Sequence, residues 1–204
     1  MKTLYSLLVF LMLIIIISCQ REEFEADKST GSLHIDIGLS LSVSEVDRTL
    51  KSTQGIEDFE VIIYRSDGSM VLTFERVSDM PDTIELKTGN YYVEARSDND
   101  LPAAFENPYY YGVSEVFTVN ANRQQSVMVQ CKLANTILSV TYSDDIVSTF
   151  SDYMTTVSSE LGSLVFIKDE TRLGYFRPMP LDILVELSYV KPDGSFCRKN
   201  LPFI

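Results

Sequence analysis

Residues 31 to 43 alternate strictly between apolar and polar side chains, and this pattern limits the fold more than any other feature of the sequence. One side of the run is aliphatic and consists of Leu33, Ile35, Ile37, Leu39, Leu41 and Val43. The other side carries His34, Asp36, Ser40 and Ser42. A period of two over this length is typical of a β-strand with one buried face.

Shorter β-rich runs, separated by turn residues, continue along the chain. Between two of them lies the segment Ser66 to Ser69, whose Asp-Gly pair supplies the positive φ of a tight hairpin. The segments Thr88 to Asn90 and Asn120 to Arg123 are further turns, and residues 44–58 are a long polar loop. Residues 31–132 thus hold about seven short strands and no convincing helix, which favours a β-sandwich.

Residues 133–204 continue the β-rich pattern. The candidate strands are 135–142, 152–159, 163–169, 172–178, 181–190 and 195–200. A complete sandwich takes about 100 residues, so this stretch is short for one. We therefore expect an all-β chain of tandem β-sandwich domains, Ig-like or transthyretin-like. The N-terminal domain occupies 31–132, and a second domain, short or incomplete, occupies 133–204.

The N-terminus has the pattern of a secretory signal. Lys2 precedes an apolar run from Leu7 to Ile17, and Ser18 and Cys19 follow it. The run is too short for a membrane span, which takes about 20 apolar residues. Its ending, Ile-Ile-Ser-Cys, resembles a bacterial lipobox, in which the cysteine is acylated and the chain is cut just before it. We expect a signal peptide at 1–18 and a lipid anchor on Cys19; an uncleaved anchor helix is the alternative.

Residues 19–30 are charged and small, and we expect them to form an acidic tether between the lipid and the fold. Their start, Gln20-Arg21-Glu22-Glu23, is similar to the short export tag of surface-exposed lipoproteins of the Bacteroidota. On composition alone, the alternative explanation of the same run is a solvated tether.

The charge and the residue content exclude several functions. Acidic residues outnumber basic ones by 29 to 17, giving a formal net charge of −12, which repels phosphate backbones and argues against a nucleic-acid partner. His34 is the single histidine, and the sequence has no G-x-S-x-G, H-E-x-x-H or P-loop motif. We therefore expect a protein that is not an enzyme, with no catalytic residue, no metal site and no cofactor.

Two cysteines remain after the lipobox. Export permits a disulfide between Cys131 and Cys197, but spacing alone cannot show whether they meet. Cys131 is in phase with Val127 and Val129, so it is better explained as a small buried hydrophobe.

The segment 98–112 contains two prolines and is predicted to be a long loop. Its aromatic residues Phe105, Tyr109, Tyr110 and Tyr111 are candidate contacts for a sugar ring or a protein partner, with packing inside the loop as the favoured alternative. Asp98, Asn99 and Asp100 could supply oxygen ligands to calcium, but these are also ordinary turn residues and we favour that explanation.

Four segments together resemble one family. They read GSLHIDIGL, MPDTIELKTGNYYVEARS, AFENPYYYG and VMVQCKLANTILSVTY. In this order they are similar to the DUF4493 family of Bacteroidota lipoproteins, across residues 31 to about 190. The resemblance implies tandem β-sandwiches related to fimbrillin-like and adhesion lipoproteins. The final residues, 200–204, stop where the family is expected to continue.

These observations lead to one expected function and one alternative. The expected function is a lipoprotein of the outer membrane, exposed at the cell surface, with a structural or adhesive role beside other surface or pilus subunits or a host ligand. The alternative is a glycan-binding lipoprotein of a polysaccharide-uptake system. The resemblance to fimbrillins also implies a candidate protease site at Arg48, where cleavage would release the first strand and open a groove for a partner strand. Retention of that strand is the favoured alternative.

Overall fold

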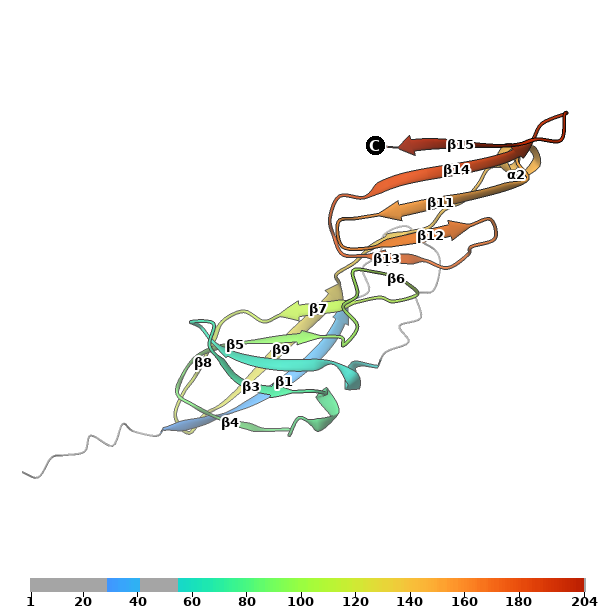
Figure 1. Ribbon diagram of the computed structural model, residues 1–204. Coiled ribbons are helices and arrows are strands. Elements are labelled where there is room, and N and C mark those ends of the chain that lie inside the picture. The colour runs from blue at the N-terminus through green and yellow to red at the C-terminus, as the bar shows by residue number, and fades with distance from the viewer. Residues whose placement is uncertain (1–28, 41–54, 204) are drawn as a thin grey trace, which may run out of the picture.

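The structure is a computed structural model that describes residues 29–40 and 55–203, and it is built mainly of β-strands (Figure 1). Its N-terminal part is one sheet of eight strands. These are β1 (Thr30–Ser40), β2 (Glu60–Arg65), β3 (Met70–Phe74), β4 (Ile84–Lys87), β5 (Gly89–Arg96), β7 (Tyr110–Val113), β8 (Phe117–Val119) and β9 (Gln124–Leu133). The short 3-10 turns η1 (Ile56–Asp58) and η2 (Val77–Asp79) flank the β2–β3 hairpin. The all-β prediction is confirmed.

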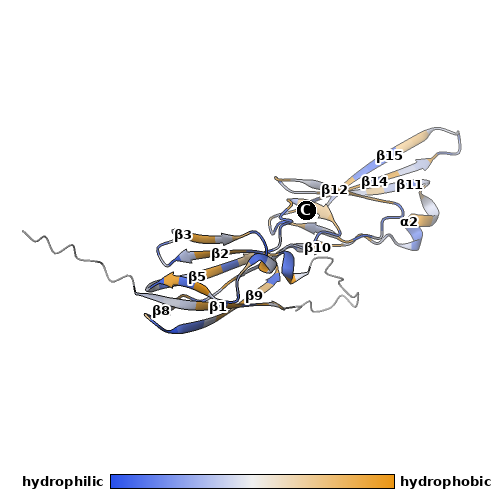
Figure 2. Ribbon diagram, turned by 90° about the horizontal axis from the view of Figure 1, so that it is seen from below, coloured by the Kyte–Doolittle hydropathy of each residue, from blue (hydrophilic) through white to orange (hydrophobic). Residues whose placement is uncertain are grey.

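The eight-stranded sheet folds over on itself to make two layers. Its strand order is β3-β2-β5-β7-β9-β1-β4, with β8 beside β5. Figure 2 shows β3, β2 and β5 in one layer and β1 and β9 in the other. The buried side chains between the layers are Leu33, Ile35, Phe59, Val61, Ile63, Ile84, Leu86, Tyr91, Val93, Ala95, Tyr110, Val119, Val129 and Cys131. The alternation in each strand thus aims one set of side chains inward.

Strand β1 is held on both sides. It runs parallel to β9 from the pair Ser32–Gln124 to the pair Ser40–Lys132, and antiparallel to β4 at its beginning. Leu33 and Ile35 are buried, as the alternating pattern predicts. The outer side chain His34 donates from Nδ1 to the backbone carbonyl of Asp82 over 2.8 Å.

The hairpin predicted at Ser66 to Ser69 is confirmed between β2 and β3. Gly68 has φ +87°, and the Asp67 carboxylate accepts hydrogen bonds from the backbone and hydroxyl of Ser69. These bonds lower the pKa of Asp67 below its ordinary value. The turn predicted at Thr88 to Asn90 is shorter than expected, because only Thr88 lies between β4 and β5, and Gly89 and Asn90 belong to β5. The two strands do not pair, since β4 lies beside β1 and β5 lies beside β2.

The C-terminal part consists of two sheets. The larger has the order β12-β11-β14-β15 and the smaller β10-β13-β6. Their strands are β6 (Ala103–Phe105), β10 (Thr136–Leu138), β11 (Asp152–Ser158), β12 (Ser163–Ile167), β13 (Gly174–Phe176), β14 (Asp182–Val190) and β15 (Phe196–Phe203). A second core between them is centred on Val157, Phe166 and Phe176. Each candidate strand of 133–204 overlaps an observed one, but β15 runs three residues past the predicted end at 200. The short helix α2 (Asp144–Thr149) is an addition to the predicted elements.

The loop predicted at 98–112 is wrong in part, because it contains β6 and the start of β7. Strand β6 pairs with β13 and belongs to the C-terminal sheets, although it lies inside the range 31–132. Asp100, just before β6, forms an ion pair of 2.9 Å with Arg177, just after β13. The chain thus crosses to the C-terminal part and returns before it completes the N-terminal sheet.

Both described cysteines are free, and they lie in different parts of the structure. Cys131 is fully buried in the N-terminal core, where its thiol lies 3.6 Å from the carbonyl oxygen of Ala95. Burial raises the pKa of the Cys131 thiol to about 11. Its prediction as a small buried hydrophobe is confirmed. Cys197 lies on β15 and is half-buried.

Candidate functional site

The structure separates the four aromatic residues that the sequence grouped in one loop. Tyr110 points into the N-terminal core, where its ring stacks near Phe59 with 6.1 Å between centroids. Phe105 belongs to the C-terminal core, with its ring edge against Phe166 and the Arg172 guanidinium 4.2 Å over its face. These two side chains pack the cores. Tyr109 is half-buried and Tyr111 is exposed, so both keep surface for a ligand.

The predicted lipidation site Cys19 and the predicted cleavage site Arg48 lie outside the described residues. Both therefore stay predictions. In the described part of the chain, no helix has the length and apolarity needed to cross a membrane.

Tyr111 belongs to a polar network that crosses three strands on the outer side of the sheet. Arg96 on β5 donates from Nε to Glu60 on β2 over 2.6 Å and from Nη1 to Glu94 over 3.2 Å. The Tyr111 hydroxyl donates to the other oxygen of Glu94 over 3.1 Å. Burial and the Glu94 carboxylate raise the pKa of Tyr111 to about 12, so the phenol stays a donor at neutral pH. The network fixes one arginine between two acids.

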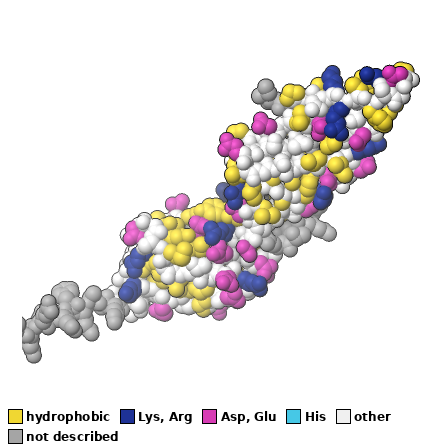
Figure 3. Space-filling model, in the orientation of Figure 1, with side chains coloured by type: hydrophobic (Ala, Val, Ile, Leu, Met, Phe, Trp, Pro, Cys, Tyr) yellow, Lys and Arg dark blue, Asp and Glu magenta, His cyan; other side chains and the backbone are white. Residues whose placement is uncertain are grey.

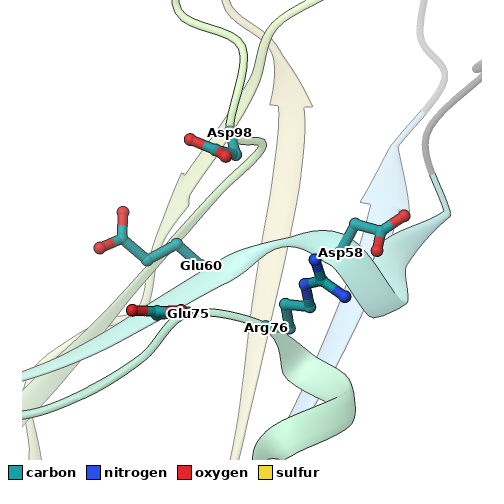
Figure 4. A pocket seen from close by; sticks show the side chains of 5 residues that line it. All are labelled: Asp58, Glu60, Glu75, Arg76 and Asp98. Carbon is teal, nitrogen blue, oxygen red and sulfur yellow. The ribbon is translucent and has the colours of Figure 1, made fainter.

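Beside this network lies a small acidic pocket of about 450 Å³, between the start of β2 and the end of β3. Its lining residues are Asp58, Glu60, Glu75, Arg76 and Asp98. Figure 4 shows Glu60 and Glu75 on one side of the pocket and Arg76 extending toward Asp58 on the other. Carboxylates on adjacent strands repel one another. The pocket is therefore suited to a positively charged side chain of a partner rather than to an acid.

Two residues of the oxygen-rich segment Asp98 to Asp100 have structural partners, while Asp98 lines the acidic pocket. Asn99 donates to the backbone carbonyl of Pro108 over 2.9 Å, and Asn107 donates to the carbonyl of Asn99 over 2.8 Å. Asp100 is the partner of Arg177. Within 29–40 and 55–203, no three acidic, histidine or cysteine side chains are grouped to hold a metal ion.

A second concave surface, of about 550 Å³, lies on the C-terminal sheet. It is an open apolar groove over β11 and β14, bordered by the segment 138–146 and by Leu201. Val157, Val185 and Leu187 form its floor. The small sheet β10-β13-β6 covers the neighbouring part of the same face.

The family of this chain is established by comparison with known protein families. A family model described as "Domain of unknown function (DUF4493)" matches residues 29–197, which include nearly all of the described strands. The chain belongs to this family. No curated protein matches the sequence.

Solved structures with some likeness to this DUF4493 chain come from Bacteroides and Porphyromonas species. The fimbrial anchor protein Mfa2 from Porphyromonas gingivalis is 12% identical, with 83% of this chain and 82% of that one covered and a TM-score of 0.37. An adhesin candidate from Bacteroides thetaiotaomicron VPI-5482 is 13% identical, with 85% and 80% covered and a TM-score of 0.41. A candidate polysaccharide-binding protein from the same organism is 11% identical, with 81% and 78% covered and a TM-score of 0.40. At this level of similarity, the functions of these proteins are not assigned to this chain.

The polar network beside Tyr111 in this DUF4493 protein could not be predicted from the sequence. Glu60 and Arg96 are 36 residues apart, and only the antiparallel register of β2 and β5 brings them together. One signal was available, since both lie at outward positions of strands predicted correctly. A pattern of this kind fixes the face of a residue but not its cross-strand neighbour.

Proposed function

We propose that the protein is a cell-surface lipoprotein, anchored through Cys19, with a structural or adhesive role rather than a catalytic one. The observation that carries the proposal is the lipobox-like Ile16 to Cys19, followed by a charged segment that leads directly into β1. The single histidine, His34, is engaged by the Asp82 carbonyl and lies 3.4 Å from Asp36. These contacts raise the pKa of His34 and give it a role in holding β1.

The arrangement of the two parts supports an anchored, projecting protein. Figure 1 shows β1 beginning at the end of the N-terminal sandwich remote from β11, β14 and β15. A lipid on Cys19 would therefore hold the N-terminal sandwich nearest the membrane and direct the C-terminal sheets outward. In this arrangement the outer faces of the N-terminal sandwich and the C-terminal sheets would both be open to other subunits or a host ligand.

The predicted cleavage at Arg48 decides whether β1 is retained in the N-terminal sheet or released from it. If β1 stays, it completes the N-terminal sheet between β9 and β4. If it is released, both neighbours lose a strand and the buried positions of Leu33 and Ile35 become an apolar groove, open to strand addition. We favour retention, because single arginines in loops are common and Arg48 has no other feature that marks it.

Two of the four residues predicted to contact a glycan remain accessible to a ligand. Tyr111 is exposed at the side of a charged network, as a sugar platform requires, and Tyr109 is half-buried nearby. Tyr110 and Phe105 are engaged in the cores, so the ligand contact reduces to Tyr109 and Tyr111.

Replacing Cys19 by Ala should move the protein from the membrane fraction to the soluble fraction of its native cells. Each buried methylene of an acyl chain contributes about 0.8 kcal/mol to membrane binding, so loss of two or three chains abolishes stable attachment. Cell fractionation with immunoblotting measures the change. Cys197→Ser is the matched control and should stay with the membrane. A Cys19→Ala protein that remains membrane-bound and keeps residues 1–18 would contradict the anchor.

A further inference from the structure

The two outer faces of the N-terminal sandwich differ in chemistry. On the β9-β1-β4 layer, the outward side chains are polar at almost every position, as is usual for a solvent-facing sheet. They are Ser32, His34, Asp36, Glu85, Lys87, Gln124, Ser126, Met128, Gln130 and Lys132. The β3-β2-β5-β7 layer departs from this pattern, because tyrosines and aliphatic residues occupy many of its outward positions.

We call this second surface the tyrosine face and define it by Met70, Tyr64, Tyr92, Tyr111 and Val113. The strand register places three of them in one row, because Met70 on β3 lies opposite Tyr64 on β2, and Tyr64 lies opposite Tyr92 on β5. The two tyrosine rings stack with 5.0 Å between centroids. Tyr111 on β7 lies opposite Arg96 of the polar network. Val113 on β7 lies opposite Glu94, two residues along β5. Figure 3 shows hydrophobic side chains gathered on the N-terminal part, with acidic and basic ones beside them.

The exposure of these residues is unusual for a sheet facing water. Met70 is 62% exposed and Val113 is 46% exposed. Ile62, in the middle of the same face, is only 2% exposed, although its cross-strand neighbours are Thr73 and Glu94. Contiguous apolar surface with a polar rim marks interaction sites, and tyrosine, methionine and arginine are enriched in protein interfaces.

The charges beside the tyrosine face define its partner. Glu60 belongs both to the Arg96 network and to the acidic pocket, so the two features form one border. Five carboxylates stand there against two arginines: Asp58, Glu60, Glu75, Glu94 and Asp98 against Arg76 and Arg96. A second copy of this chain, with a net charge of −12, would be repelled by such a border. Lysine and arginine side chains of another protein would be attracted to it.

We infer that the tyrosine face is a docking surface for another protein, one that presents an apolar patch bordered by lysine or arginine side chains. The stacked rings of Tyr64 and Tyr92 and the fixed Arg96 network form a preorganised centre, so little side-chain freedom is lost on binding. The acidic pocket receives the partner's basic residues. The inference rests on the proposed surface role. It adds to that role the kind of subunit that the protein binds.

Photo-crosslinking in the native cells tests this assignment. The probe is p-benzoylphenylalanine, incorporated into the full chain in place of Met70 or Val113. The matched control carries it in place of Met128, which is 65% exposed on the polar outer face. Irradiation should join Met70 and Val113 variants to one and the same protein of different sequence and should leave the Met128 variant unjoined. The protein's own anchoring is measured separately by fractionation of the same cells, so a failure to dock is distinguished from a failure to reach the surface.

The joined protein is then purified and its binding to the full chain measured. Met70→Ser together with Val113→Ser should weaken binding at least about tenfold, while Met128→Ser leaves it unchanged. Raising the salt from about 50 mM to about 500 mM should also weaken binding severalfold, as charge complementarity requires. Crosslinks to a second copy of the chain or to carbohydrate would overturn the inference. So would crosslinks formed equally well from Met128, or the absence of any crosslink from Met70 and Val113.

Discussion

Leu33→Asp should abolish the folding of the N-terminal sandwich. Leu33 is fully buried on β1, between the partners Gln125 on β9 and Ile84 on β4. An unpaired carboxylate at this position loses its hydration without a compensating partner, which costs several kcal/mol or more. Truncation to Ala alone would cost about 2–5 kcal/mol, a large part of the about 5–15 kcal/mol that stabilises a typical domain. Urea unfolding followed by circular dichroism measures the loss.

The control for this substitution lies on the same strand. Ser40→Asp places the same carboxylate at the end of β1, opposite Lys132, where an opposite charge is available. Its free energy of unfolding should change by less than about 0.5 kcal/mol. If Leu33→Asp unfolds at the same urea concentration as the unaltered protein, β1 is not part of the cooperative fold.

Gly112→Ala should have the second largest effect. A Cβ at this position would lie 2.6 Å from the carbonyl oxygen of Gln130 and 2.9 Å from the Cα of Cys131. Both are backbone atoms of β9, so neither can rotate away, and β7 and β9 would have to separate. Strand β7 is the link between the two layers, because it pairs with β5 on one side and β9 on the other. We expect a loss of about 3 kcal/mol or more, measured by thermal and urea unfolding.

Gly38→Ala is the matched control for this prediction. A Cβ there would lie 3.3 Å from the end of the Gln130 side chain, which is flexible and can move. The expected change in the free energy of unfolding is below about 1 kcal/mol. Equal losses for the two variants would show that general strand propensity, and not the close approach of β7 to β9, sets the cost.

The strands of this protein could largely be predicted from its sequence, because they carry strict signals. The alternation from Gly31 matches β1 in the described residues, and the Asp67-Gly68 turn lies between β2 and β3 as expected. Strands β6 and β7 were missed because prolines and asparagines surround them. At these positions tertiary pairing, with β13 for β6 and with β5 and β9 for β7, overrides the local pattern.

The candidate site was less predictable than the fold. Tyr64 and Tyr92 occupy outward positions of recognisable strands, so a tyrosine-rich outer face could have been inferred from alternation alone. The parallel pairing of β1 with β9 and the Glu60–Arg96 contact depend on strand order, which alternation does not encode. For the same reason, the contiguous run from Phe105 to Tyr111 gave a false impression of one aromatic site.

The mass of the first peptide of the mature protein, isolated from native membranes, tests the central claim most directly. A lipoprotein that keeps β1 should begin at Cys19, with the mass of its acyl chains added to that residue. The same sample should contain an uninterrupted peptide across Arg48 and Thr49. A first peptide that still contains residues 1–18, or an unmodified Cys19, would contradict the lipid anchor. A chain that begins at Thr49 would contradict the retention of β1.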